Sequence, residues 1–231
     1  MRFRNESSFS VIRWLGLTGL VFAVLGVAPD LRAEMEEDPS PPASFGELLA
    51  GFKGTTGLEA RFEEEKYLAL LAAPLRSSGR LFFAPPSILL RRVEKPRPQD
   101  ILVTRNQVRI SDDSGEQTID LDVRREVRPL VESLIWIFTG DLESLEQTYR
   151  VDYRVLAGPD GEGKRWQVRL EPRQAPLSLL VSELRVSGSG RAADTLELIE
   201  TSGDRTLTRL FDVNPDRQFD AAERLELFAS P

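Results

Sequence analysis

The sequence predicts a mainly β fold with a helical lid (α+β), in which an unclosed antiparallel β-barrel of about 10 or 11 strands is covered by helices. Three observations lead to this prediction. Short segments with strand-like alternation follow one another along most of the chain. The connections between them are too short for crossover helices, so neighbouring strands have to pair antiparallel. One apolar stripe of helical period interrupts the pattern near the middle of the chain.

Composition removes several classes of chemistry. The 231 residues include no cysteine and no histidine, which excludes disulfides, thiolate metal sites and a histidine general base. Asp and Glu number 37 against 30 Lys and Arg, a formal charge of −7. An acidic protein repels nucleic acid phosphates, so we expect no nucleic acid partner.

Residues 1–33 have the pattern of a secretory signal peptide. Three arginines precede an apolar run at 14–28, which is short for a membrane span. Cleavage after Ala33 is the favoured interpretation, and an uncleaved N-terminal anchor is the alternative. Residues 34–43 are acidic and proline-rich, so they are expected to form a disordered leader. Residues 44–231 are expected to form a single domain.

The first elements follow from local signals. Ser44 and Glu47 fit a capping box, which predicts a helix that ends at the glycines 51–54. From Leu58 the period changes to two, which predicts a strand with one solvated face. Turn residues then separate further predicted strands at 79–83, 87–93, 100–104, 107–110 and 117–121.

The region 125–149 breaks this pattern. Its apolar residues recur at helical spacing, and Trp136 and Ile137 fall outside the stripe, so the predicted helix is more apolar than burial of one face requires. A second short helix is expected at 142–149. The stripe consists of Val127, Leu130, Val131, Leu134, Ile135 and Phe138, and strands are expected again at 149–156, 164–171, 179–186, 194–200 and 206–213.

Three groups of charged residues have alternative interpretations. Asp212, Asn214 and Asp216, followed by Asp220 and Glu223, match positions of a calcium loop, but Arg217 stands where that loop needs glycine. Calcium binding is therefore disfavoured. Other acidic and basic groups are expected to be mainly solvated, although the basic ones also suit an acidic partner or a lipid headgroup. The acidic groups are 63–65 with Asp120 and Asp122, and the basic ones are Arg91, Arg92, Lys95 and Arg97, and Arg124, Arg125 and Arg128.

From Ser44 to the C-terminus, the order of these elements resembles the LolA family of periplasmic outer-membrane lipoprotein carriers. None of the stretches that carry the resemblance is a catalytic signature. They are Leu58-Glu-Ala-Arg-Phe62, Gly79-Arg-Leu-Phe-Phe83 followed by Pro86, Asp100-Ile-Leu-Val103 and Trp166-Gln-Val-Arg-Leu-Glu-Pro172.

The resemblance implies a monomeric, non-enzymatic carrier in the periplasm, without cofactor or metal. Its apolar cavity would shelter the acyl chains of a lipoprotein or lipid on the way from an inner-membrane transporter to an outer-membrane acceptor. An envelope sensor or scaffold that works with a membrane exporter is the alternative. The residues expected to line the cavity are Phe62, Leu81, Phe83, Ile88 and Leu90 on strands, and Leu134, Ile135 and Phe138 on the lid helix.

One departure from the family pattern concerns the lid. The family has an arginine just before the proline that opens the third strand, where it holds the lid closed. This sequence has Ala84-Pro85-Pro86 there. The resemblance therefore implies a paralogue with a different lid contact, and its cargo is left open.

Overall fold

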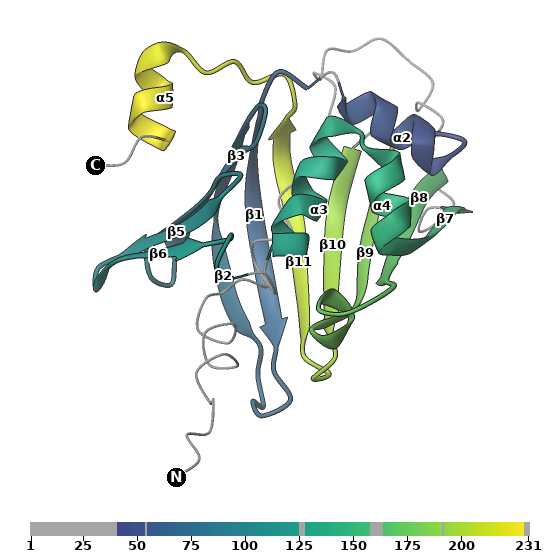
Figure 1. Cartoon of the computed structure of the whole chain (residues 1–231), viewed down its shortest axis with the longest axis horizontal. Coiled ribbons are helices and arrows are strands. Elements are labelled where there is room, and N and C mark those ends of the chain that lie inside the picture. The colour runs from purple at the N-terminus through teal and green to yellow at the C-terminus, as the bar shows by residue number, and fades with distance from the viewer. Residues whose placement is uncertain (1–40, 54, 125–127, 158–163, 191, 229–231) are drawn as a thin grey trace.

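The computed structural model describes residues 41–53, 55–124, 128–157, 164–190 and 192–228 (Figure 1). Within these residues, eleven strands form one antiparallel sheet in the order β6-β5-β4-β3-β2-β1-β11-β10-β9-β8-β7. The two edge strands, β6 and β7, do not pair with each other, so the predicted unclosed antiparallel sheet is confirmed. The predicted signal peptide and most of the predicted leader lie outside the described residues.

The N-terminal half of the sheet is a run of hairpins. Each strand from β1 to β6 pairs with the next one in the sequence. The elements are α2 (Phe45–Phe52), β1 (Leu58–Tyr67), β2 (Leu75–Ala84), β3 (Ile88–Lys95), β4 (Gln99–Val103), β5 (Gln107–Asp112) and β6 (Gly115–Asp120).

The C-terminal half begins with two helices and continues as a second run of hairpins. These hairpins lead back to β1, which pairs with β11. The elements are α3 (Arg128–Thr139), α4 (Leu142–Thr148), β7 (Tyr149–Ala157), β8 (Lys164–Pro172), η3 (Leu177–Leu179), β9 (Val181–Ser189), β10 (Ala192–Glu200), β11 (Arg205–Asn214) and α5 (Ala221–Phe228).

The predicted order of elements is confirmed, with two corrections. The strand expected from Leu179 starts at Val181, because residues 177–179 form the 3₁₀ turn η3. The helix α5 was not predicted. Asp220 accepts a hydrogen bond from the backbone of Glu223, and the Glu223 carboxylate accepts one from the backbone of Asp220. Two of the residues of the calcium template therefore form the N-terminal cap of this helix.

The two faces of the sheet carry separate hydrophobic clusters. The face that we call inner packs against α2, α3, α4 and η3, and contains most of the buried apolar side chains. Figure 1 shows these helices lying across one side of the sheet. On the opposite, outer face a smaller cluster lies under the C-terminal segment, which contributes Phe219, Leu227 and Phe228.

Close packing of β8 on β9 depends on one glycine. Trp166 is fully buried, and its indole nitrogen donates a hydrogen bond to the carbonyl of Gly190 at 3.0 Å. A Cβ at Gly188 would lie 2.6 Å from the Trp166 ring and 1.8 Å from the carbonyl oxygen of Ala192. Only glycine fits beneath this indole without moving the backbone.

The described helices are short. The longest of them, α3, has 12 residues, and none in the described ranges is long and apolar enough to cross a membrane.

Candidate functional site

Three of the predicted cavity residues lie together on the inner face. Phe62 on β1 and Leu81 and Phe83 on β2 are at most 3% exposed and belong to the main core. The pairing of Phe62 with Gly79 and of Leu58 with Phe83 keeps these side chains on the same side of the sheet. Together with α2 and α3, they form an apolar surface under a helical cover.

The placement predicted for Ile88 and Leu90 is wrong. Leu90 lies in the outer cluster with Phe82, and Ile88 packs against the same cluster. The side chains of β3 that reach the main core are Leu89 and Val93. The run at the start of β3 is apolar on both faces because α5 covers the outer one, so its alternation does not show which residues point inward.

The lid helix buries part of the predicted stripe and one residue outside it. Leu130, Val131 and Ile137 are buried in the main cluster, whereas Ile135 is half-buried. Ile137 was expected outside the stripe. The side chains of Leu134 and Phe138 lie outside the described part of the chain. Helix α3 ends at Thr139, and the next residue, Gly140, has a positive φ of 67°, which glycine adopts at little energetic cost.

A buried hydrogen bond ties the lid to the sheet. The hydroxyl oxygens of Ser133 on α3 and Tyr149 on β7 are 2.8 Å apart. Ser133 already donates to the carbonyl of Pro129 at 2.6 Å, so Tyr149 is the donor to Ser133. Burial raises the pKa of Tyr149 to about 12, although the bond to Ser133 opposes the shift. Ala84 stands where the LolA family has the arginine that holds the lid closed. Its methyl group is buried in the outer cluster and has no hydrogen-bond donor, so it makes no such contact with the lid.

Beyond Phe62 the inner face becomes polar. Arg91 on β3 and Glu64 on β1 form an ion pair with a nitrogen–oxygen distance of 3.0 Å, and their side chains are only 6% and 11% exposed. The Arg91 guanidinium also stacks over the Phe62 ring, 4.3 Å from its centre. The hydroxyls of Ser77 and Thr208 donate to the Glu64 carboxylate.

A second charged pair lies next to the first. Lys66 follows Glu64 on the inner side of β1, and its ammonium is 3.6 Å from the carboxylate of Glu200 on β10. Burial raises the pKa of Glu200, while Lys66 opposes the shift. The hydroxyl of Thr206, opposite Lys66, is buried without a hydrogen-bond partner in the described residues. This end of the inner face therefore suits polar groups rather than acyl chains.

These four charged residues were missed as part of the site. Period-two alternation from Phe62 places Glu64 and Lys66 on the same face of β1 as Phe62. The sequence therefore does contain a signal for these two of the four charged residues. Placing Arg91 on the inner face requires knowing which side chains of β3 point inward. That direction was predicted wrongly, because Leu89 and Leu90 are equally apolar.

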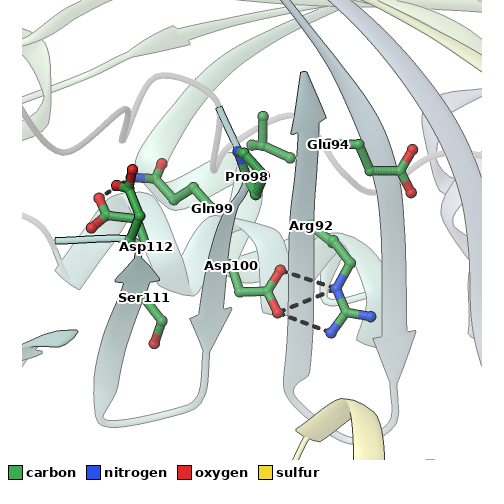
Figure 2. A pocket seen from close by; sticks show the side chains of 9 residues that line it. Arg92, Glu94, Pro98, Gln99, Asp100, Ser111 and Asp112 are labelled. Carbon is green, nitrogen blue, oxygen red and sulfur yellow. Dashed lines mark hydrogen bonds and ion pairs between the residues drawn. The ribbon is translucent and has the colours of Figure 1, made fainter. Parts of the chain in front are cut away.

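A pocket of about 520 Å³ lies elsewhere, between β3, β4 and β5. Figure 2 shows that Arg92 reaches Asp100 and that Gln99 reaches Asp112 across its wall. The Arg92 nitrogens are 2.9 to 3.2 Å from the Asp100 oxygens. Charged and amide side chains line this pocket together with Val93 and Pro98, and none of the residues predicted to line the cavity belongs to it.

The other charged candidates are engaged in local contacts. Asp212 pairs with Arg61 on β1, and Asn214 accepts from the backbone of Asp216. Glu65 accepts from Tyr67 and Arg76, and Asp122 pairs with Arg128. Among the described residues, no three Asp or Glu side chains converge in a way that could hold a metal ion.

The first prediction concerns the lid hydrogen bond. Tyr149→Phe should lower the free energy of unfolding at neutral pH by about 1 kcal/mol, because one buried hydrogen bond is lost. The folded protein raises the Tyr149 pKa from 10 to about 12, so this contribution is complete below pH 10. It should be lost as the pH rises toward 12.

Urea unfolding at pH 7 and at several pH values between 10 and 12 measures this difference. Tyr67→Phe is the control, since the Tyr67 hydroxyl bonds only the partly exposed Glu65. An advantage of the wild type that stays constant up to pH 12 would contradict the assignment.

The second prediction concerns the buried ion pair. Arg91→Met alone should destabilise the protein by about 3 to 5 kcal/mol, because Glu64 is left charged and buried. The double variant Glu64→Leu/Arg91→Met should recover most of this loss. Arg92→Met is the matched control, since its pair with Asp100 is more exposed and should contribute about 1 kcal/mol or less. Denaturant unfolding of the four proteins tests the prediction, and a double variant no more stable than Arg91→Met refutes it.

Comparison with known proteins gives one family match. Residues 45–216 match the family described as outer membrane lipoprotein carrier protein LolA-like. No curated protein matches the chain. The match covers every strand and the helices from α2 to α4, and it ends before α5.

Three solved structures are similar at low identity. A LolA superfamily protein from Nitrosomonas europaea is 10% identical, with a TM-score of 0.41, over 78% of this chain and 97% of that one. An outer membrane lipoprotein-sorting protein domain from Vibrio parahaemolyticus is 10% identical, with a TM-score of 0.42, over 77% and 94%. MucB in its complex with MucA from Pseudomonas aeruginosa is 11% identical, with a TM-score of 0.42, over 76% and 57%. Likenesses this weak carry no argument about the function of this chain.

Proposed function

Because this chain belongs to the family of LolA-like outer membrane lipoprotein carrier proteins, we propose that it is a periplasmic carrier. In this proposal it shelters the acyl chains of a lipoprotein or another lipid and moves them from the inner to the outer membrane. An inner-membrane transporter loads it, and an outer-membrane acceptor receives the cargo. The protein works as a monomer, with no catalytic step and no cofactor.

The observation that supports this proposal is the apolar inner face under a helical cover. Phe62, Leu81 and Phe83 form part of a surface against which α2 and α3 pack through apolar side chains. An acyl chain can replace these contacts because both are apolar and non-directional. Each buried methylene contributes about 0.8 kcal/mol, so a long chain gains on the order of 10 kcal/mol relative to water.

The cover also explains how the cargo is released. In the empty protein the buried side chains of α3 fill the inner face, so they compete with the acyl chain for the same surface. This competition lowers the net affinity to a level at which an acceptor can take the cargo. The bond from Tyr149 to Ser133 adds one directional contact to the closed state.

The dense packing of the inner face favours a second candidate function. Leu81, Ile101 and Val131 are each at most 1% exposed, which leaves little free space beside them. A lipid-sensing or scaffolding protein of the envelope, working with a membrane exporter, needs no large cavity. In that case the fold serves mainly to present an outer surface to a protein partner.

The third prediction separates the two functions. Native mass spectrometry and lipid extraction of the protein, exported to and purified from a bacterial periplasm, should reveal an acyl-bearing adduct. Leu81→Gln should lower its occupancy about tenfold, because a buried amide without a partner opposes the acyl chain by at least about 1.4 kcal/mol. An empty protein that also binds no fluorescent fatty acid supports the sensor or scaffold instead.

Leu90→Gln is the matched control. Leu81 and Leu90 are both leucines on adjacent strands and both 1% exposed, but they lie in the inner and outer clusters respectively. The two variants should lose similar stability, and only Leu81→Gln should lose cargo. Equal loss of cargo in both would show that the inner face is not the binding surface.

A further inference from the structure

The loop between β1 and β2 is apolar and exposed. Residues 68–74 read Leu-Ala-Leu-Leu-Ala-Ala-Pro and contain no charged or hydrogen-bonding side chain. Leu70 is 83% exposed and Leu71 47%, and Leu75 at the start of β2 is 52% exposed. Hairpin loops usually consist of Gly, Asn, Asp, Ser or Pro, whose conformations suit turns. Neither turn formation nor core packing explains this run of leucine and alanine.

The loop is held in place by hydrogen bonds. The backbone nitrogen of Leu71 donates to the carbonyl of Leu68 at 2.9 Å, which forms a turn at the exposed leucines. The backbone nitrogen of Ala69 donates to the Asp204 carboxylate at 3.0 Å. The loop is therefore fixed against the turn between β10 and β11.

A fourth exposed leucine lies at the same end of the sheet. Leu179 on η3 is 68% exposed, and its carbonyl accepts a hydrogen bond from the hydroxyl of Thr201 at 2.8 Å. Thr201 and Asp204 both belong to the β10–β11 turn, which thus contacts both apolar segments. We call Leu70, Leu71, Leu75 and Leu179 the leucine tip. Figure 1 shows the β1–β2 loop and the β10–β11 turn together at the end of the sheet opposite α2.

Basic side chains lie at this end as well. The structure pairs Arg91 with Glu64 and Arg92 with Asp100, so two members of that basic group serve the fold. The other two are exposed: Lys95 is the last residue of β3, and Arg97 lies in the turn between β3 and β4. Ser78, three residues after Leu75 on β2, pairs with Lys95, so these basic residues lie next to the strand from which the leucine tip projects.

From these contacts, we propose that the leucine tip inserts into the surface of an anionic lipid bilayer, while Lys95 and Arg97 contact the lipid phosphates. The apolar side chains of a projecting loop can insert at the boundary between lipid headgroups and acyl chains. Basic residues beside the loop add electrostatic attraction to anionic lipid. A specific protein interface differs, because it combines an apolar centre with polar groups that select the partner. The loop offers no such polar group.

Isolated exposed leucines have no such meaning, since large apolar side chains are common on protein surfaces. Leu225 on α5 is one of these, at 69% exposed, and it serves as an internal control. The inference takes the biological role of the membrane contact, the delivery of lipid, from the proposed carrier function. The membrane contact itself depends only on the leucine tip and its basic neighbours.

The test is flotation of the full exported protein with vesicles. Wild type should bind vesicles of phosphatidylethanolamine and phosphatidylglycerol more tightly than phosphatidylcholine vesicles. Leu70→Ser/Leu71→Ser should weaken binding at least about tenfold, which corresponds to 1.4 kcal/mol and is less than the transfer of two leucines provides. Leu225→Ser should bind like wild type. Lys95→Gln/Arg97→Gln should lose the preference for anionic vesicles.

Three outcomes would overturn the proposal: no binding by wild type, equal binding by wild type and Leu70→Ser/Leu71→Ser, or binding only to vesicles that carry membrane proteins. The last outcome would indicate a protein partner. Fatty acid binding without vesicles is measured on the same samples. If the wild type binds fatty acid but no vesicles, only this inference is refuted. If the wild type binds vesicles but no fatty acid, only the carrier function is refuted.

Discussion

The pairing of β1 with β11 is the contact on which the architecture depends. Within the described strands it is the one neighbour pair that is not a sequence-adjacent hairpin, and it joins Phe62 to Leu210 and Glu64 to Thr208. Without it, the chain would be two separate antiparallel sheets with half of the inner face each. Closing a loop of this length carries a large entropy loss before any contact forms, so this step is expected to limit the rate of folding.

The sequence predicts the elements of this fold more accurately than the directions of the side chains. On β1 the polar residues Arg61 and Glu63 alternate with apolar ones, so the inward face is evident from the period. On β3, apolar residues lie on both faces, because α5 covers the outer one. The sequence therefore shows no alternation of apolar and polar residues there that would identify the inner face. The helix α5 was itself missed because its cap residues, Asp220 and Glu223, also fit a calcium template. Asp followed three residues later by Glu is a capping signal that would have revealed it.

The inner face has two parts with different physical properties. Around Leu81 and Phe83 it is apolar, and its contacts with the helices depend on shape and area. Around Glu64 and Arg91 it is charged, and the contacts are directional, with both partners buried. A buried pair of this kind adds little net stability over an apolar pair, but it disfavours alternative pairings of the strands. We therefore expect the charged part to fix the position of β1 relative to β3 and β11, and the apolar part to be the one that exchanges contacts in the proposed carrier.

The order of elements constrains how the cover can move. Helices α3 and α4 lie between β6 and β7 in the chain, and these are the two edge strands of the sheet. These two helices of the cover are therefore joined to the sheet at both of its margins, whereas α2 precedes β1. We therefore expect α3 and α4 to rise or slide between these two attachment points rather than to swing outward from one of them. Any such movement acts on both margins together. The gap between the edge strands β6 and β7 and the position of α3 and α4 are therefore expected to change together.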